Sequence, residues 1–196
     1  MNTVPGSHVD RLLTASLVVA PALSLVSAVL YALGGWESDP AGAVFHVLGA
    51  LAFTLVVVRV ATWASDGIAA VLLVVGSIGV AGNVAYGFDA IHVGLGDVSL
   101  VDQGGAAVLI KPLGLAFPLV LLLCAVALRR VAPRWVVALI GLGGLAFPIA
   151  NIGNIPALGV VVWVLLAVGF GALAGPRSPS AQAGRTPARA VEESPR

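Results

Sequence analysis

Residues 105–128 read GAAVLIKPLGLAFPLVLLLCAVAL, and this stretch indicates the fold class. Its only charged residue is Lys111, which is also the only lysine in the chain. A run of roughly 17 to 25 predominantly apolar residues matches the hydrocarbon thickness of a bilayer. The stretch therefore predicts a transmembrane helix, and a charge placed inside it needs a physical reason.

The composition of the rest of the chain indicates the same environment. Of the 196 residues, 59% are hydrophobic and only 10% are charged, and the mean hydropathy is +1.06. A typical soluble domain is about 25% charged. The chain has more apolar surface than one soluble core could bury, so we expect the lipid bilayer as its main partner and no nucleic-acid partner.

Six apolar spans are predicted, at about residues 12–33, 41–62, 67–87, 105–128, 135–151 and 156–174. The last two come from one long run that is interrupted by Asn151, Gly153, Asn154 and Pro156, residues that favour a tight turn. We predict an all-α, polytopic bundle of six transmembrane helices. Residues 1–11 would form a short N-terminal segment, and the Pro-, Ser- and Arg-rich residues 175–196 a disordered tail.

The charges between the spans predict the orientation. Acidic residues Glu37, Asp39, Asp89, Asp97 and Asp102 fall on one side, where there is no arginine. All nine arginines fall on the other: Arg11, Arg59, Arg129, Arg130, Arg134, Arg177, Arg185, Arg189 and Arg196. The positive-inside rule then places both termini in the cytoplasm. The use of Arg over Lys, with abundant Ala, Gly and Val, suggests a GC-rich genome, so we expect a bacterial-type plasma membrane.

Four polar side chains interrupt the predicted spans: His46, Asn83, Lys111 and Asn151. With the orientation above, all four fall in the outer half of the membrane. Each shares a helical stripe with small residues or proline, and small residues mark the faces at which membrane helices approach closely. We therefore expect the four side chains to point into the bundle and to form a polar pocket that opens outward.

Lys111 would be the positive member of this pocket, with Asp89 or Asp102 as its counter-ion, and the sequence does not choose between them. Pro112 and Pro118 would each remove a helical hydrogen bond, as in the broken helices of many transporters. The alternative is that the helix begins at Pro112, because proline favours the first turn, and that Lys111 lies at the membrane interface.

The other polar residues also have structural interpretations. His46 and Asn83 could hydrogen-bond neighbouring helices, and Asn151 could belong to the turn. A haem between His46 and His92 has no supporting motif, so we expect no cofactor and no metal. The phosphate loop, the His-Glu-x-x-His motif and the Gly-x-Ser-x-Gly motif do not occur in the sequence, and we expect no enzymatic activity and no catalytic residues.

Two functions are consistent with these features. The first is transport of a small solute or ion through an outward-facing pocket built from His46, Asn83, Asp89, Lys111 and Asn151. The second is a non-catalytic membrane scaffold or accessory subunit whose glycine-rich stripes bind partner helices or a second copy of the chain. A solvent-connected cavity at Lys111 would favour the first function, and a dry, fully packed bundle would favour the second.

Overall fold

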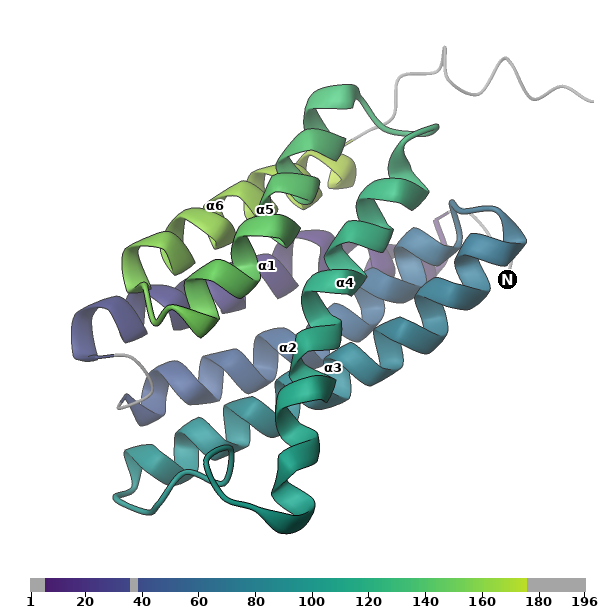
Figure 1. Cartoon of the computed structure of the whole chain (residues 1–196). Helices are drawn as coiled ribbons and strands as arrows, with labels where there is room; N and C mark the ends of the chain where they lie inside the picture. The colour runs from purple at the N-terminus through teal and green to yellow at the C-terminus, as the bar shows by residue number, and fades with distance from the viewer. Residues whose placement is uncertain (1–5, 36–38, 176–196) are drawn as a thin grey trace, which may run out of the picture.

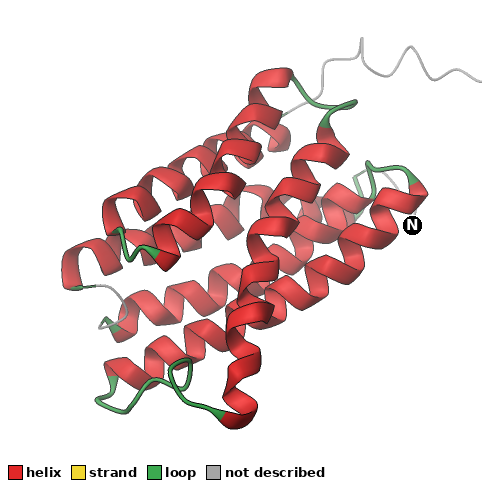
Figure 2. Cartoon of the chain, in the orientation of Figure 1, coloured by secondary structure: helices red, strands yellow, loops and turns green. Residues whose placement is uncertain are grey.

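A computed structural model describes residues 6–35 and 39–175 (Figure 1). These residues form helices and connecting turns, and no strand is assigned among them (Figure 2). The helices are α1 (His8–Gly34), α2 (Pro40–Ala61), α3 (Asp66–Gly94), the short 3-10 helix η1 (Gly105–Leu109), α4 (Ile110–Leu128), α5 (Arg134–Ile152) and α6 (Pro156–Ala174). Glu37 and the predicted tail beyond Gly175 lie outside the described residues.

All six α-helices of the described chain are long and apolar enough to cross a membrane, with η1 extending the fourth span. The all-α fold predicted from the sequence is therefore confirmed, with six long apolar helices that could each cross a membrane, and the chain is a multi-pass membrane protein. Helix α3 is longer than the predicted apolar span and continues past Gly87 to Gly94. This extension leaves the acidic residue Asp89 inside a helix.

Local signals fix several helix ends. Asp39 caps α2 by accepting hydrogen bonds from the amides of Ala41 and Gly42, and Pro40 occupies the first turn, where its missing N–H costs nothing. Residues 153–155 form the predicted tight turn between α5 and α6. Asn154 adopts a left-handed conformation there, with φ 48°.

The helices form a closed ring in which each one packs against the next and α6 returns to α1 (Figure 1). Arg11, Arg59 and the loop with Arg129, Arg130 and Arg134 lie at one end of the ring, which we call the arginine end. Residues 95–109 and 153–155 lie at the opposite end, which we call the cavity end. The arginines of the described residues thus all lie at one end of the bundle, where Asp10 and Asp66 accompany them, and Lys111 lies at the other.

Glycine allows α3 and α4 to cross closely. A Cβ on Gly82 would overlap the backbone of Leu113 and Gly114, and a Cβ on Gly79 would lie 2.9 Å from backbone atoms of Phe117. Gly49 and Gly76 are likewise packed against α1 and α2 of the same chain. These small-residue faces are therefore used inside the bundle, as expected for close helix packing in membranes.

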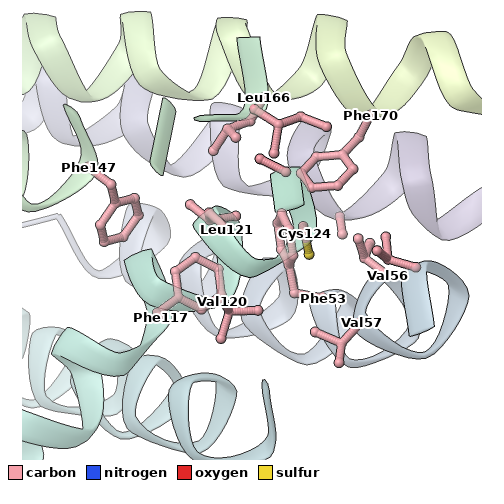
Figure 3. Packing of buried hydrophobic residues seen from close by; sticks show 14 of the residues in the cluster. Phe53, Val56, Val57, Phe117, Val120, Leu121, Cys124, Phe147, Leu166 and Phe170 are labelled. Carbon is pink, nitrogen blue, oxygen red and sulfur yellow. The ribbon is translucent and has the colours of Figure 1, made fainter. Parts of the chain in front are cut away.

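Aromatic side chains fill the centre of the ring (Figure 3). The Phe53 ring lies 5.3 Å from Phe117, 5.7 Å from Trp163 and 5.9 Å from Phe170, measured between centroids. Phe147 joins them, 5.4 Å from Phe117 and 5.8 Å from Trp163. We call these five residues the aromatic cluster. Because all five are buried, it closes the middle of the bundle.

Candidate functional site

A cavity of about 470 Å³ lies at the cavity end, between α3, α4, α5 and the loop before η1. We call it the α4–α5 cavity. This volume is within the range of small-molecule sites, about 300 to 1,000 Å³. The lining combines polar and apolar groups: Asn83, Tyr86, Ser99, Val101, Asp102, Ile110, Lys111, Gly114, Leu115, Pro118, Phe147, Pro148, Asn151, Ile152 and Asn154.

The cavity exists because α4 and α5 separate toward this end of the bundle. They pack together in the other half, where a Cβ on Gly144 would lie 3.1 Å from Leu121, and they still meet at the Phe117–Phe147 contact. Beyond that contact the two helices diverge (Figure 1). Pro118 and Pro148 line the cavity at the point of separation. The near-repeats AFP at 116–118 and 146–148 therefore lie opposite each other.

Lys111 lies at the mouth of this cavity and pairs with Asp102. The Lys111 Nζ is 3.2 Å from Asp102 Oδ1, and the side chains are 58% and 76% exposed. Helix α4 begins at Ile110, so Pro112 lies in its first turn. Two interpretations of Lys111 were open, a pocket residue and a residue at the membrane interface. The structure has features of both, because Lys111 lines a cavity and also lies in the first turn of its helix.

His46 and Asn83 are joined across helices α2 and α3. The His46 Nε2 lies 3.2 Å from Asn83 Oδ1, so the ring nitrogen is the donor. Tyr31 and Tyr86 flank the imidazole, with ring centroids 6.4 and 6.1 Å away. Asn83 also lines the α4–α5 cavity, whereas His46 does not.

His46 instead lines a second, much smaller cavity of about 20 Å³ near the centre of the ring. We call it the inner chamber. It is lined by Ser27, Ala28, Tyr31, His46, Tyr86, Phe147, Asn151, Gly159, Val162 and Trp163. Its size and polar lining suit a single water molecule. Tyr86, Phe147 and Asn151 line both cavities and so form the partition between them.

Asp89 has a different position from the other predicted pocket residues. Its side chain is 3% exposed and does not belong to the lining of either cavity. It accepts hydrogen bonds from the Ser99 hydroxyl at 2.8 Å and from the amides of Leu100 and Val101 at 2.6 and 3.4 Å. Asp89 therefore holds the loop that supplies Ser99, Val101 and Asp102 to the cavity wall.

Of the five residues predicted for the pocket, the structure brings Asn83, Lys111 and Asn151 to one cavity and leaves His46 directly behind it. Asn151 also donates a hydrogen bond from Nδ2 to the Phe147 carbonyl at 2.8 Å. His92, which might have paired with His46, lies 3.3 Å from Asp97 instead. Within residues 6–35 and 39–175, no three His, Cys, Asp or Glu side chains come together as a metal site.

The sequence interpretation missed several lining residues. Tyr86 was detectable, because it follows Asn83 by three positions and so shares its helical face. Ser99 and Asn154 lie in loops, where spacing does not predict direction. Ser27 is buried on α1 and donates a hydrogen bond to the Gly42 carbonyl at 2.7 Å.

No protein-family model matches this chain, and comparisons with curated proteins and with solved structures found no similar protein. The functional interpretation therefore depends on the geometry alone.

Proposed function

We propose that this protein is a small membrane transporter that takes its ligand into the α4–α5 cavity from one face of the membrane. The observation that carries the proposal is the convergence of Asn83, Lys111 and Asn151 on a cavity of about 470 Å³. Ionisable and amide side chains are costly inside a bilayer unless they have partners or contact water. A cavity open at the Lys111 mouth provides that contact.

The cavity is blind, which favours a carrier over an open channel. Phe147 lines the cavity and packs on the buried Phe117, so the aromatic cluster lies directly below. The inner chamber lies behind the partition of Tyr86, Phe147 and Asn151, and it provides further polar groups, including His46. In this proposal a ligand crosses only when α4 and α5 move relative to each other. Pro118 and Pro148 make such movement easier, because each lacks the N–H that would complete the helical hydrogen bonds.

We place the cavity end on the outer face of a bacterial-type plasma membrane. The arginine end carries Arg11, Arg59 and the loop with Arg129, Arg130 and Arg134. The positive-inside rule assigns such an end to the cytoplasm. The described cavity would then be the outward-facing state of a transport cycle that involves no chemical reaction.

The scaffold hypothesis rested on glycine stripes that would bind partner helices. Gly49, Gly76, Gly79 and Gly82 are instead packed against helices of the same chain. This use of the small-residue faces favours transport over the scaffold role.

The proposal is tested by reconstituting the protein in liposomes and measuring the movement of defined probes. A suitable panel is serine, phosphoethanolamine, inorganic phosphate, rubidium and a fluorescent ethanolamine phospholipid. We expect protein-dependent movement of at least one probe, and we expect Lys111→Met to slow it about two- to fivefold, the size expected from one exposed charge interaction.

Arg129→Met is the matched control, because it removes an exposed positive charge at the opposite end. We expect this variant to leave the rate unchanged, with both variants present at the wild-type protein level. Equal movement of every probe in protein-free liposomes would contradict the proposal, and so would a Lys111→Met protein with wild-type rates.

A further inference from the structure

The wall of the α4–α5 cavity includes exposed apolar side chains from both α4 and α5. Leu115 of α4 and Ile152 of α5 both line the cavity, and they are 51% and 71% exposed. Their helices diverge beyond the Phe117–Phe147 contact. Exposed apolar side chains are suited to contact with lipid, so a path between these two helices would connect the cavity with the hydrocarbon of the surrounding leaflet.

The charged groups at the mouth are balanced. Among the described lining residues, the charged side chains are Lys111 and Asp102, which contact each other at 3.2 Å. An anion bound at Lys111 would be repelled by Asp102, and a cation bound at Asp102 would be repelled by Lys111. A ligand that carries both charges would satisfy both residues. Opening the pair costs little, because an ion pair this exposed to solvent contributes little to stability.

The position of this pair matches the headgroup level of a membrane. Lys111 lies in the first turn of α4, and lysines at helix ends reach toward the interface. Leu115, Pro118 and Phe147 add apolar wall to the cavity, beside the amide side chains of Asn83 and Asn151. The cavity therefore offers a charged pair at the level of a lipid headgroup and apolar wall for the start of the acyl chains.

We propose that the α4–α5 cavity binds an ethanolamine-type phospholipid from the surrounding leaflet, with its phosphate at Lys111 and its ammonium at Asp102. The acyl chains leave the cavity between Leu115 and Ile152. A primary ammonium donates hydrogen bonds to a carboxylate, whereas the quaternary ammonium of a choline lipid cannot. This inference rests on the proposed function and names the ligand class of the same cavity.

The test is native mass spectrometry of the full chain released from bilayers that contain equal amounts of ethanolamine, choline and glycerol phospholipids. For the wild type we expect ethanolamine lipid to be enriched about two- to fivefold over the bilayer composition, the size expected from one exposed ion pair. Asp102→Asn should shift the preference to the anionic glycerol lipid, because only the positive charge remains. Lys111→Met should remove the enrichment.

Asp97→Asn is the control. Asp97 is an exposed aspartate of the same loop, but its carboxylate contacts His92 and does not line the cavity. It should retain the wild-type preference. Bound lipid with the composition of the bilayer in the wild type, or an unchanged preference in Asp102→Asn, would overturn the inference.

A soluble zwitterion could satisfy the same two charges. If millimolar phosphoethanolamine displaces the lipid as well as a short-chain ethanolamine phospholipid does, the ligand is a free zwitterion and the lipid assignment is overturned. Probe movement in liposomes is measured independently. Lys111-dependent movement without any lipid preference would overturn this inference while the proposed function stands.

Discussion

Single polar residues inside the bundle divide into two kinds. His46 and Asn83 bond to each other across α2 and α3, whereas Lys111 and Asp102 pair at the mouth with most of their surface exposed. Helical spacing predicted that His46 and Asn83 face inward, because residues on one helix have a fixed periodicity. It could not choose between Asp89 and Asp102 as partner of Lys111, because Asp102 belongs to a loop whose path depends on the hydrogen bonds of Asp89.

The His46–Asn83 bond can be tested for its contribution to stability. Asn83→Leu would leave the His46 ring nitrogen without its partner in the bundle, so we expect the free energy of unfolding to fall by about 1 to 2 kcal/mol. The measurement is reversible unfolding in mixed micelles. The double variant His46→Phe with Asn83→Leu should recover part of this loss, since both polar groups are then removed. An Asn83→Leu protein of wild-type stability would contradict the role of this bond.

At the scale of elements, the contact between α3 and α4 positions the cavity. The sequence predicted both helices and their small-residue faces, but not the angle at which they cross or the divergence of α4 from α5. Those features arise from specific pairs, such as Gly82 against Leu113 and Phe117 against Phe147. A second contact, between α1 and α2, is made at the arginine end by Arg59, which pairs with Asp10 at 2.8 Å and stacks on Trp63.

Gly82→Ala tests the α3–α4 contact. The added methyl group would overlap the backbone of Leu113 and Gly114, so the helices must separate, and we expect a loss of about 1 to 3 kcal/mol in the free energy of unfolding. The control is Gly171→Ala on α6, where an added Cβ meets no atom within 4 Å. The control should retain wild-type stability. Equal stability of the two variants would show that the α3–α4 approach is looser than described.

At the scale of the whole molecule, the described chain is a closed ring of helices whose middle is closed by the aromatic cluster and whose one end is hollow. Composition and span length were sufficient to predict the six helices, because the bilayer restricts the spanning elements to long apolar helices. A polar pocket was predicted, but its closed inner end was not, because that end depends on how six helices pack around the aromatic cluster. If the cavity opens to the outside of the cell, as the predicted orientation requires, then water reaches the Gly114 face of α4 from outside.

The most direct measurement of this consequence is the reaction of Gly114→Cys, in intact cells, with a charged thiol reagent that does not cross membranes. Gly114 lines the cavity and has room for a side chain. The only native cysteine, Cys124, is buried and gives no background. Leu119→Cys on the lipid-exposed face of α4 is the control. We predict rapid labelling of Gly114→Cys and none of Leu119→Cys. A Gly114→Cys protein that reacts only after solubilisation, or only in inverted vesicles, would contradict the account.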